Sequence, residues 1–172
     1  MYIPDLTCLP ATHPPSPYDF PLPLMRDGKW GIGLLPSGVE LYAVGWLGNN
    51  VPHIGHVSDK CISALFNAYV NKAIFSDDMQ GWHNCQLCST TEEWYPDGKI
   101  GPIVHWQGQS LRLFGHGHYL VRYGKSVYIA PALILHYVLN HSYQPPDEFV
   151  QAVSQGDFLT YDDLIWKENH NE

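Results

Sequence analysis

The stretch Gly81-Trp82-His83-Asn84-Cys85-Gln86-Leu87-Cys88 has two cysteines with two residues between them. Two thiolates at this spacing can turn inward on one tight loop and bind one soft metal ion. Far downstream, His136 and His141 have four residues between them. The four side chains have the types and local spacings of a tetrahedral zinc site, with sulfur at about 2.3 Å and nitrogen at about 2.0–2.1 Å from the ion. We therefore expect one structural zinc ion bound by Cys85, Cys88, His136 and His141.

The histidine pair fits one ion only under a condition on the local backbone. Residues five positions apart on a regular helix lie about 140° apart around its axis. His136 and His141 can therefore bind one ion only if the last helical turn unwinds, or if His141 lies just past the helix. Residues 142–146 end in two prolines and favour such an end. His83, in the same loop as the cysteines, is an alternative ligand that could replace one of the two later histidines.

Composition is typical of one globular domain. The chain has 172 residues, of which 45% are hydrophobic and 13% aromatic. No apolar run approaches the 18 or so residues of a membrane span, and no basic start followed by an apolar stretch suggests a secretory signal. We therefore expect a cytoplasmic protein with no membrane partner. Thiols stay reduced in that compartment, so the cysteine pair indicates a metal site and not a disulfide framework.

The charge is unevenly distributed along the chain. The formal net charge is −8, and residues 130–172 contain seven acids but one base. An acidic C-terminal third argues against non-specific nucleic-acid binding, which needs a cationic face. It would suit a basic partner protein, but a solvated face that keeps the protein soluble is the simpler explanation, and we favour it.

The first 25 residues contain seven of the 14 prolines, with apolar residues interleaved among them. Proline interrupts helices and central strands, so we expect residues 1–25 to form an extended arm that packs partly on the body of the protein. Residues 26–172 are expected to form a single α+β zinc-binding domain.

Hydrophobic periodicity and turn residues predict the elements of that domain. Helices are expected in four places, and a hairpin is expected to join residues 29–35 to residues 39–47 across Pro36-Ser37-Gly38. The predicted fold is α+β, a small antiparallel sheet with three to four helices, in which zinc joins a loop to a distant helix in a treble-clef-like arrangement. The expected helices are 59–72, 131–140, a short one from Asp147 and a last one after Thr160; the other expected strands are 102–107, 110–114, 119–123 and 126–130.

Several phrases resemble a family of small uncharacterised bacterial proteins. The family pattern is GWHxCxxC followed by YxAPxxxxHYVxxHxYxPPxEF, and the chain matches it at residues 81–88 and 128–149. Residues 43–47 add the phrase AVGWL, and the resemblance covers roughly residues 40–153. It implies that Cys85 and Cys88 pair with His136 and His141, and it implies no particular activity. The proline-rich arm and the acidic C-terminus lie outside it.

A second group of histidines offers an alternative site. His116 and His118 alternate in a glycine-bounded segment, so on a strand they would point the same way. A third imidazole ligand could come from His105, His53 or His56. Three histidines with an open position would form a catalytic metal site. A polar hairpin turn explains the same pattern, because no acidic residue follows closely enough to act as a base.

These observations support two hypotheses about function. The first is a non-enzymatic, zinc-stabilised protein-interaction module with a basic protein partner, for example an immunity protein that neutralises a toxin. The second is a metal-dependent hydrolase or nuclease that uses His105, His116 and His118. The chain contains no phosphate-binding glycine loop, HExxH or GxSxG motif, which removes the commonest alternatives.

Overall fold

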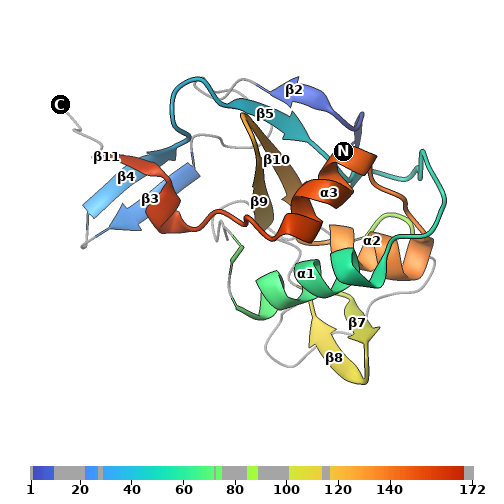
Figure 1. Ribbon diagram of the computed structural model, residues 1–172. Coiled ribbons are helices and arrows are strands. Elements are labelled where there is room, and N and C mark those ends of the chain that lie inside the picture. Colours follow the sequence, from blue (N-terminus) through green and yellow to red (C-terminus); the bar gives the residue numbers. More distant parts are fainter. Residues whose placement is uncertain are drawn as a thin grey trace.

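The computed structural model describes residues 2–9, 22–26, 29–71, 73–74, 85–88, 101–113 and 117–168. Three α-helices and a short 3-10 helix lie among small sheets (Figure 1). The helices are α1 (Asp59–Val70), α2 (Ile134–His141), α3 (Asp147–Gln155) and η1 (Tyr161–Asp163). The strands are β1 (Tyr2–Ile3), β2 (Thr7–Leu9), β3 (Leu22–Arg26), β4 (Lys29–Leu34), β5 (Glu40–Ala43), β6 (Trp46–Leu47), β7 (Ile103–Trp106), β8 (Gln109–Arg112), β9 (His118–Tyr123), β10 (Ser126–Pro131) and β11 (Ile165–Glu168).

The central sheet has the strand order β2-β5-β10-β9. The pairs β2–β5 and β9–β10 are antiparallel, and the pair β5–β10 is parallel. A parallel pair needs a long crossover, and here the connection carries α1, the β7–β8 hairpin and β9. The α+β class with small sheets and three helices is confirmed, and the central sheet is mixed because of this one parallel pair.

The predicted hairpin between residues 29–35 and 39–47 is wrong. Strand β4 pairs with β3 and β11 in a separate three-stranded sheet, whereas β5 joins the central sheet. Leu41 and Ala43 of β5 are completely buried, as expected of a strand with neighbours on both edges and cover on its faces. That burial outweighs the local turn signal, which predicts only a change of direction at residues 36–38.

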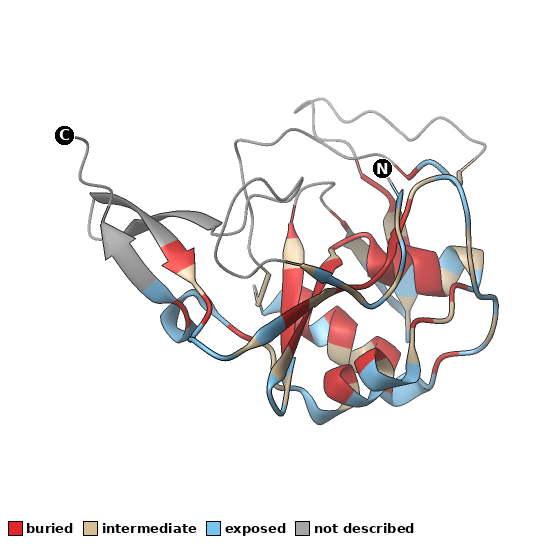
Figure 2. Cartoon of the chain, turned by 90° about the horizontal axis from the view of Figure 1, so that it is seen from above, coloured by how far each residue is buried: buried red, intermediate tan, exposed pale blue. Residues whose placement is uncertain are grey.

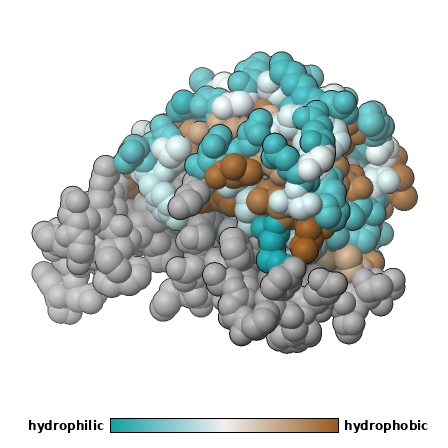
Figure 3. Space-filling view, turned by 90° about the horizontal axis from the view of Figure 1, so that it is seen from below, coloured by the Kyte–Doolittle hydropathy of each residue, from teal (hydrophilic) through white to brown (hydrophobic). Residues whose placement is uncertain are grey.

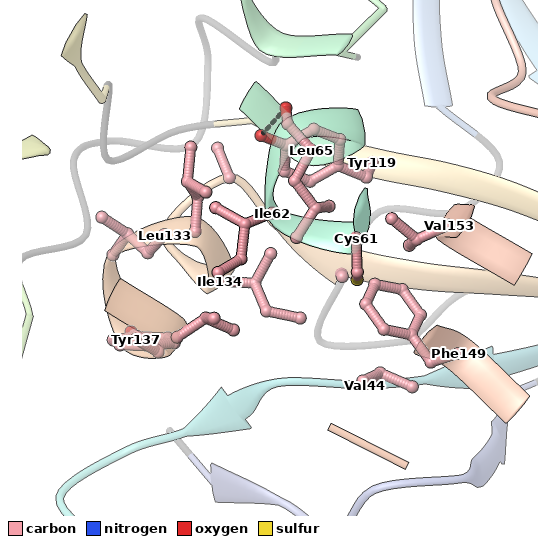
Figure 4. Close-up of a cluster of buried hydrophobic side chains, with 14 of the residues drawn as sticks. Val44, Cys61, Ile62, Leu65, Tyr119, Leu133, Ile134, Tyr137, Phe149 and Val153 are labelled. Carbon is pink, nitrogen blue, oxygen red and sulfur yellow. Dashed lines mark hydrogen bonds between the residues drawn. The ribbon is translucent and has the colours of Figure 1, made fainter. Parts of the chain in front are cut away.

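Side chains of the central sheet alternate between two layers of core. Along β10, Val127 and Ile129 face one hydrophobic cluster, and Tyr128 and Ala130 face the other, which the helices cover. Figure 4 shows the helix-side cluster, where the hydroxyl of Tyr119 donates a hydrogen bond of 3.1 Å to the Leu65 carbonyl of α1. Buried residues concentrate in the strands and on the inner sides of the helices (Figure 2).

The helices follow their sequence signals, except at the start of α2 and near the C-terminus. The helix expected from residue 131 begins only at Ile134, because Pro131 is still part of β10 and pairs with His118. Ser58 caps α1 by accepting a hydrogen bond from the Cys61 amide at 3.4 Å, as expected from a serine before an amphipathic run. The helix predicted after Thr160 extends only over η1, with Thr160 and Asp163 forming a capping box. Ile165–Glu168 then pair with β4 as strand β11, so the expected helix through residues 164–166 is wrong.

The N-terminal residues take part in both the central sheet and a small two-stranded sheet. Strand β1 pairs with β6, and β2 pairs with β5. The division into an arm of residues 1–25 and a domain of residues 26–172 stays a prediction. Among the described residues, no helix is long and apolar enough to cross a membrane.

Candidate metal centre

Two distant segments bring four metal-ligand side chains together. Cys85 and Cys88 lie in a short loop beside α2, whose residues include His136 and His141 (Figure 1). One ligand atom from each of these residues lies within 4.8 Å of every other. We call this group the Cys2His2 cluster. Within the described ranges it is the only group of three or more histidine, cysteine, aspartate or glutamate residues close enough to hold a metal ion.

Four of the six distances between ligand atoms of the Cys2His2 cluster are close to the edges of a coordination tetrahedron. Cys88 Sγ lies 3.2 Å from His136 Nε2 and 3.5 Å from His141 Nε2, and Cys85 Sγ lies 3.4 Å from His141 Nε2. The two Nε2 atoms are 3.1 Å apart. With zinc bond lengths, such edges would be about 3.5 Å between sulfur and nitrogen and about 3.3 Å between nitrogens. The side chains therefore need to move by a few tenths of an ångström at most along these edges to bind an ion.

The end of α2 explains how two histidines five positions apart face the same point. His141 is the last residue of the helix, and Ser142 follows in the left-handed conformation (φ 53°). The N–H of Ser142 donates to the carbonyl of Tyr137, five residues back, so the last turn is wider than a regular α-helical turn. The imidazole rings of His136 and His141 consequently lie 4.8 Å apart, nearly perpendicular to each other. The condition drawn from the sequence, an unwound last turn, is met.

Burial makes this group of side chains chemically unusual without a metal ion. Burial raises the pKa of the Cys85 thiol to about 11. Burial, and then the nearby His141, lower the pKa of His136 to about 4, and burial also lowers the pKa of His141. Without a metal ion the thiol of Cys85 and both imidazoles are therefore neutral near pH 7. A bound dication would displace the thiol protons and offset the thiolate charges, which is how metal binding is coupled to proton release.

Of the other histidines singled out from the sequence, the ones that the structure describes are not part of this group: His53, His56, His105 and His118. His105 is exposed on β7, where its Nδ1 lies 2.8 Å from Ser110 Oγ. His118 is on β9 in the central sheet, and its ring centre lies 5.3 Å from that of Trp46. His83 and His116 lie outside the described residues. The site composed of His105, His116 and His118 therefore stays a prediction, and so does the role of His83 as an alternative ligand.

Sequence reasoning missed three residues that connect the N-terminus to this region. The Asp5 carboxylate accepts hydrogen bonds from the Gly45 amide and from the Tyr143 hydroxyl, each of 2.8 Å. Tyr143 is completely buried and lies two positions after His141. Asp5 and Tyr143 are 138 positions apart, so no short-range pattern could have indicated their contact.

The described acidic residues near the C-terminus are partly exposed and partly paired. Asp147 and Glu148 are exposed in the first turn of α3, where negative charge is favourable. Asp157 accepts a hydrogen bond of 2.9 Å from Arg122 Nε and forms a surface ion pair with it. In the view of Figure 3, hydrophilic side chains cover much of the coloured surface, and hydrophobic ones lie in several smaller areas among them.

The chain was compared with known families, curated proteins and solved structures. The model of a domain of unknown function, DUF7919, matches residues 1–154. The match starts at residue 1, so it also includes residues 1–39, which the resemblance seen in the sequence does not cover. No curated protein and no solved structure matches the chain.

Proposed function

We propose that this chain, which belongs to the DUF7919 family of unknown function, is a non-enzymatic protein-interaction module stabilised by one structural zinc ion. The observation that carries the proposal is the Cys2His2 cluster, because its four side chains supply a complete tetrahedral set of protein ligands. A zinc ion with four protein ligands has no open position for water or substrate. The site therefore serves architecture and not catalysis.

The choice of zinc follows from the donor atoms. Two thiolates and two imidazoles are the ligand set of many structural zinc sites, whereas magnesium and calcium prefer oxygen ligands. Only 7% of Cys85 and 3% of His136 are exposed, so a bound ion would be shielded from solvent on the side of these two ligands, whereas Cys88 and His141 are partly exposed. The ion would hold the loop of residues 85–88 against the end of α2.

Metal analysis tests the zinc part of this proposal. Protein purified without added metal should contain one zinc ion per chain, and the Cys88→Ser variant should contain none. The Cys8→Ser variant is the matched control, because Cys8 is an exposed free cysteine on β2. Purified wild-type protein without any metal would contradict the proposal. A second metal ion that survives the Cys88→Ser change would instead favour the catalytic histidine hypothesis.

The interaction part of the proposal rests on charge. Seven of the 17 acidic residues lie in residues 130–172, and Asp147 and Glu148 are exposed. A negative surface steers and orients a positively charged partner. We propose a basic protein as the partner, with an immunity protein that neutralises a basic toxin as the specific case.

Affinity capture tests the partner class. The wild-type chain should retain a basic protein at low salt and lose it as ionic strength rises, because salt screens exposed charges. The double variant Asp147→Lys, Glu148→Lys should capture it poorly, whereas the Glu40→Lys variant, which changes an exposed acid on β5, should behave as wild type. Capture that is unaffected by the double change, or a partner without basic character, would overturn this part of the proposal. For the immunity role, a toxin gene next to the gene for this chain is also expected.

A further inference from the structure

A hydrogen-bond network joins the N-terminal strands to the chain that follows the Cys2His2 cluster. Asp5 lies in the turn between β1 and β2, and each of its carboxylate oxygens accepts one hydrogen bond: Oδ1 from the Gly45 N–H, and Oδ2 from the Tyr143 hydroxyl. Burial, and then the Asp5 carboxylate, raise the pKa of Tyr143, so its hydroxyl remains a proton donor. Asp5 thereby connects the segment between β5 and β6 to the segment after α2.

The position of Tyr143 depends on the end of α2. Its backbone N–H donates to the Tyr137 carbonyl at 3.1 Å, across the left-handed residue Ser142. On the other side, the amide of Gly55 donates to Ser142 and the amide of Gln144 donates to His53. Residues 142–144 are thus held between residues 53–55 and the wide last turn of α2. A metal ion that binds His136 and His141 would fix the width of that turn.

The N-terminal strands are short. Their other attachments are the pairing of β1 with β6 and of β2 with β5, the hydrogen bond from the Leu6 amide to the Ala43 carbonyl, and the packing of Ile3 and Leu9 against the core. Strand β1 has two residues and β2 has three, and both Tyr2 (47%) and Leu6 (37%) are substantially exposed. Leu6 has a φ of 61°, a left-handed conformation that is unfavourable for leucine and persists only where its surroundings hold it. The two hydrogen bonds of Asp5 therefore add to the strand pairing that holds residues 2–9 on the sheet.

We propose that metal binding at the Cys2His2 cluster controls the docking of residues 2–9, and that the hydrogen bond between Asp5 and Tyr143 transmits the effect. This inference rests on the proposed metal site. When the metal is bound, the last turn of α2 is fixed and the Tyr143 hydroxyl donates its hydrogen bond to Asp5. Strand β1 then pairs with β6, and β2 pairs with β5. When the metal leaves, the turn relaxes, Asp5 loses a partner, and residues 2–9 separate from the sheet before the core unfolds.

Hydrogen exchange measured by mass spectrometry tests this on the full chain, with zinc bound and after chelation. The reporters are the amides of residues 2–9 and the amide of Gly45, which donates directly to Asp5. On chelation their exchange should accelerate about tenfold or more, as expected when a hydrogen bond to a charged group is lost. Amides of the β9–β10 pair should change much less.

The Tyr143→Phe variant separates the proposed link from general loss of structure. With one zinc ion still bound, its reporter amides should already exchange as fast as those of chelated wild type. The Tyr123→Phe variant is the control, because it removes an exposed hydroxyl that donates to Gln151 at 3.3 Å. If chelation unfolds the whole wild-type chain, the comparison of the zinc-bound Tyr143→Phe and wild-type proteins decides the question.

The outcomes distinguish this inference from the proposed function. A chain that never binds zinc overturns both. A chain that binds one zinc ion, stays folded on chelation and keeps the same exchange in residues 2–9 overturns only the control of docking. Unchanged exchange in zinc-bound Tyr143→Phe also overturns it, because the proposed link would then carry no effect.

Discussion

Replacing Cys88 with serine should remove the metal ion and lower the melting temperature by about 8–16 °C, a range derived from the separation of the ligands. Cys88 and His136 are 48 positions apart. The unfolded chain contains the same ligands, but it must close this loop of 48 residues before all four can bind one ion. In the chain-entropy formula for a cross-link, that closure costs about 4 kcal/mol at 25 °C.

The folded chain has already closed the loop, so the metal should stabilise it over the unfolded chain by about this amount. One kcal/mol corresponds to about 2–4 °C in melting temperature for a domain of this length. The expected decrease of about 8–16 °C follows directly. Substituting an exposed cysteine usually changes the free energy of unfolding by no more than about 0.5 kcal/mol, so the loss of about 4 kcal/mol expected here can be distinguished from it.

Thermal melts followed by circular dichroism, with added zinc and with a chelator, provide the assay. Wild type should lose about 8–16 °C on chelation. Cys88→Ser should melt near the chelated wild type in both conditions, and the control Cys8→Ser should behave as wild type. The reasoning fails if zinc-loaded wild type melts at the same temperature after chelation, or if Cys88→Ser retains a zinc-dependent melting temperature.

Two further predictions concern backbone conformation and pH. Gly45→Ala should lower the free energy of unfolding, measured in urea, by about 1–3 kcal/mol more than Gly38→Ala. Both glycines have φ near 80°, but only at position 45 would the new methyl group lie 2.9 Å from Ile134 Cδ1. Equal decreases in the two variants would contradict the packing argument. In metal-free protein, burial, and then His141, lower the pKa of His136 to about 4, below about 6.5 in the unfolded chain. The contribution of neutral His136 to stability is therefore present above pH 6.5 and is lost as the pH falls towards 4. The urea concentration at the unfolding midpoint should decrease over this range. If the midpoint of a His136→Asn variant decreases as steeply with falling pH, the assignment to His136 is refuted.

Local signals explain which elements were predictable. The cap at Ser58 and the amphipathic run after it predict α1, and the apolar runs separated by turn residues predict the strands β9 and β10. These features depend on residues within a few positions of one another. The errors, the hairpin of residues 29–47 and the helix through residues 164–166, arise where a strand finds its partner in a distant segment. Burial against that partner outweighs the local preference.

The sequence by itself determined the ligand types of the Cys2His2 cluster and the conditions for their meeting, because thiol and imidazole chemistry and short spacings are local properties. The tertiary structure decided that these ligands come together, through a wide last turn of α2 and a loop placed beside it. It also decided that β5 lies inside a mixed sheet and that Asp5 reaches Tyr143 across 138 positions. Such contacts depend on the packing of the whole chain, since no segment short enough to show a pattern contains both partners.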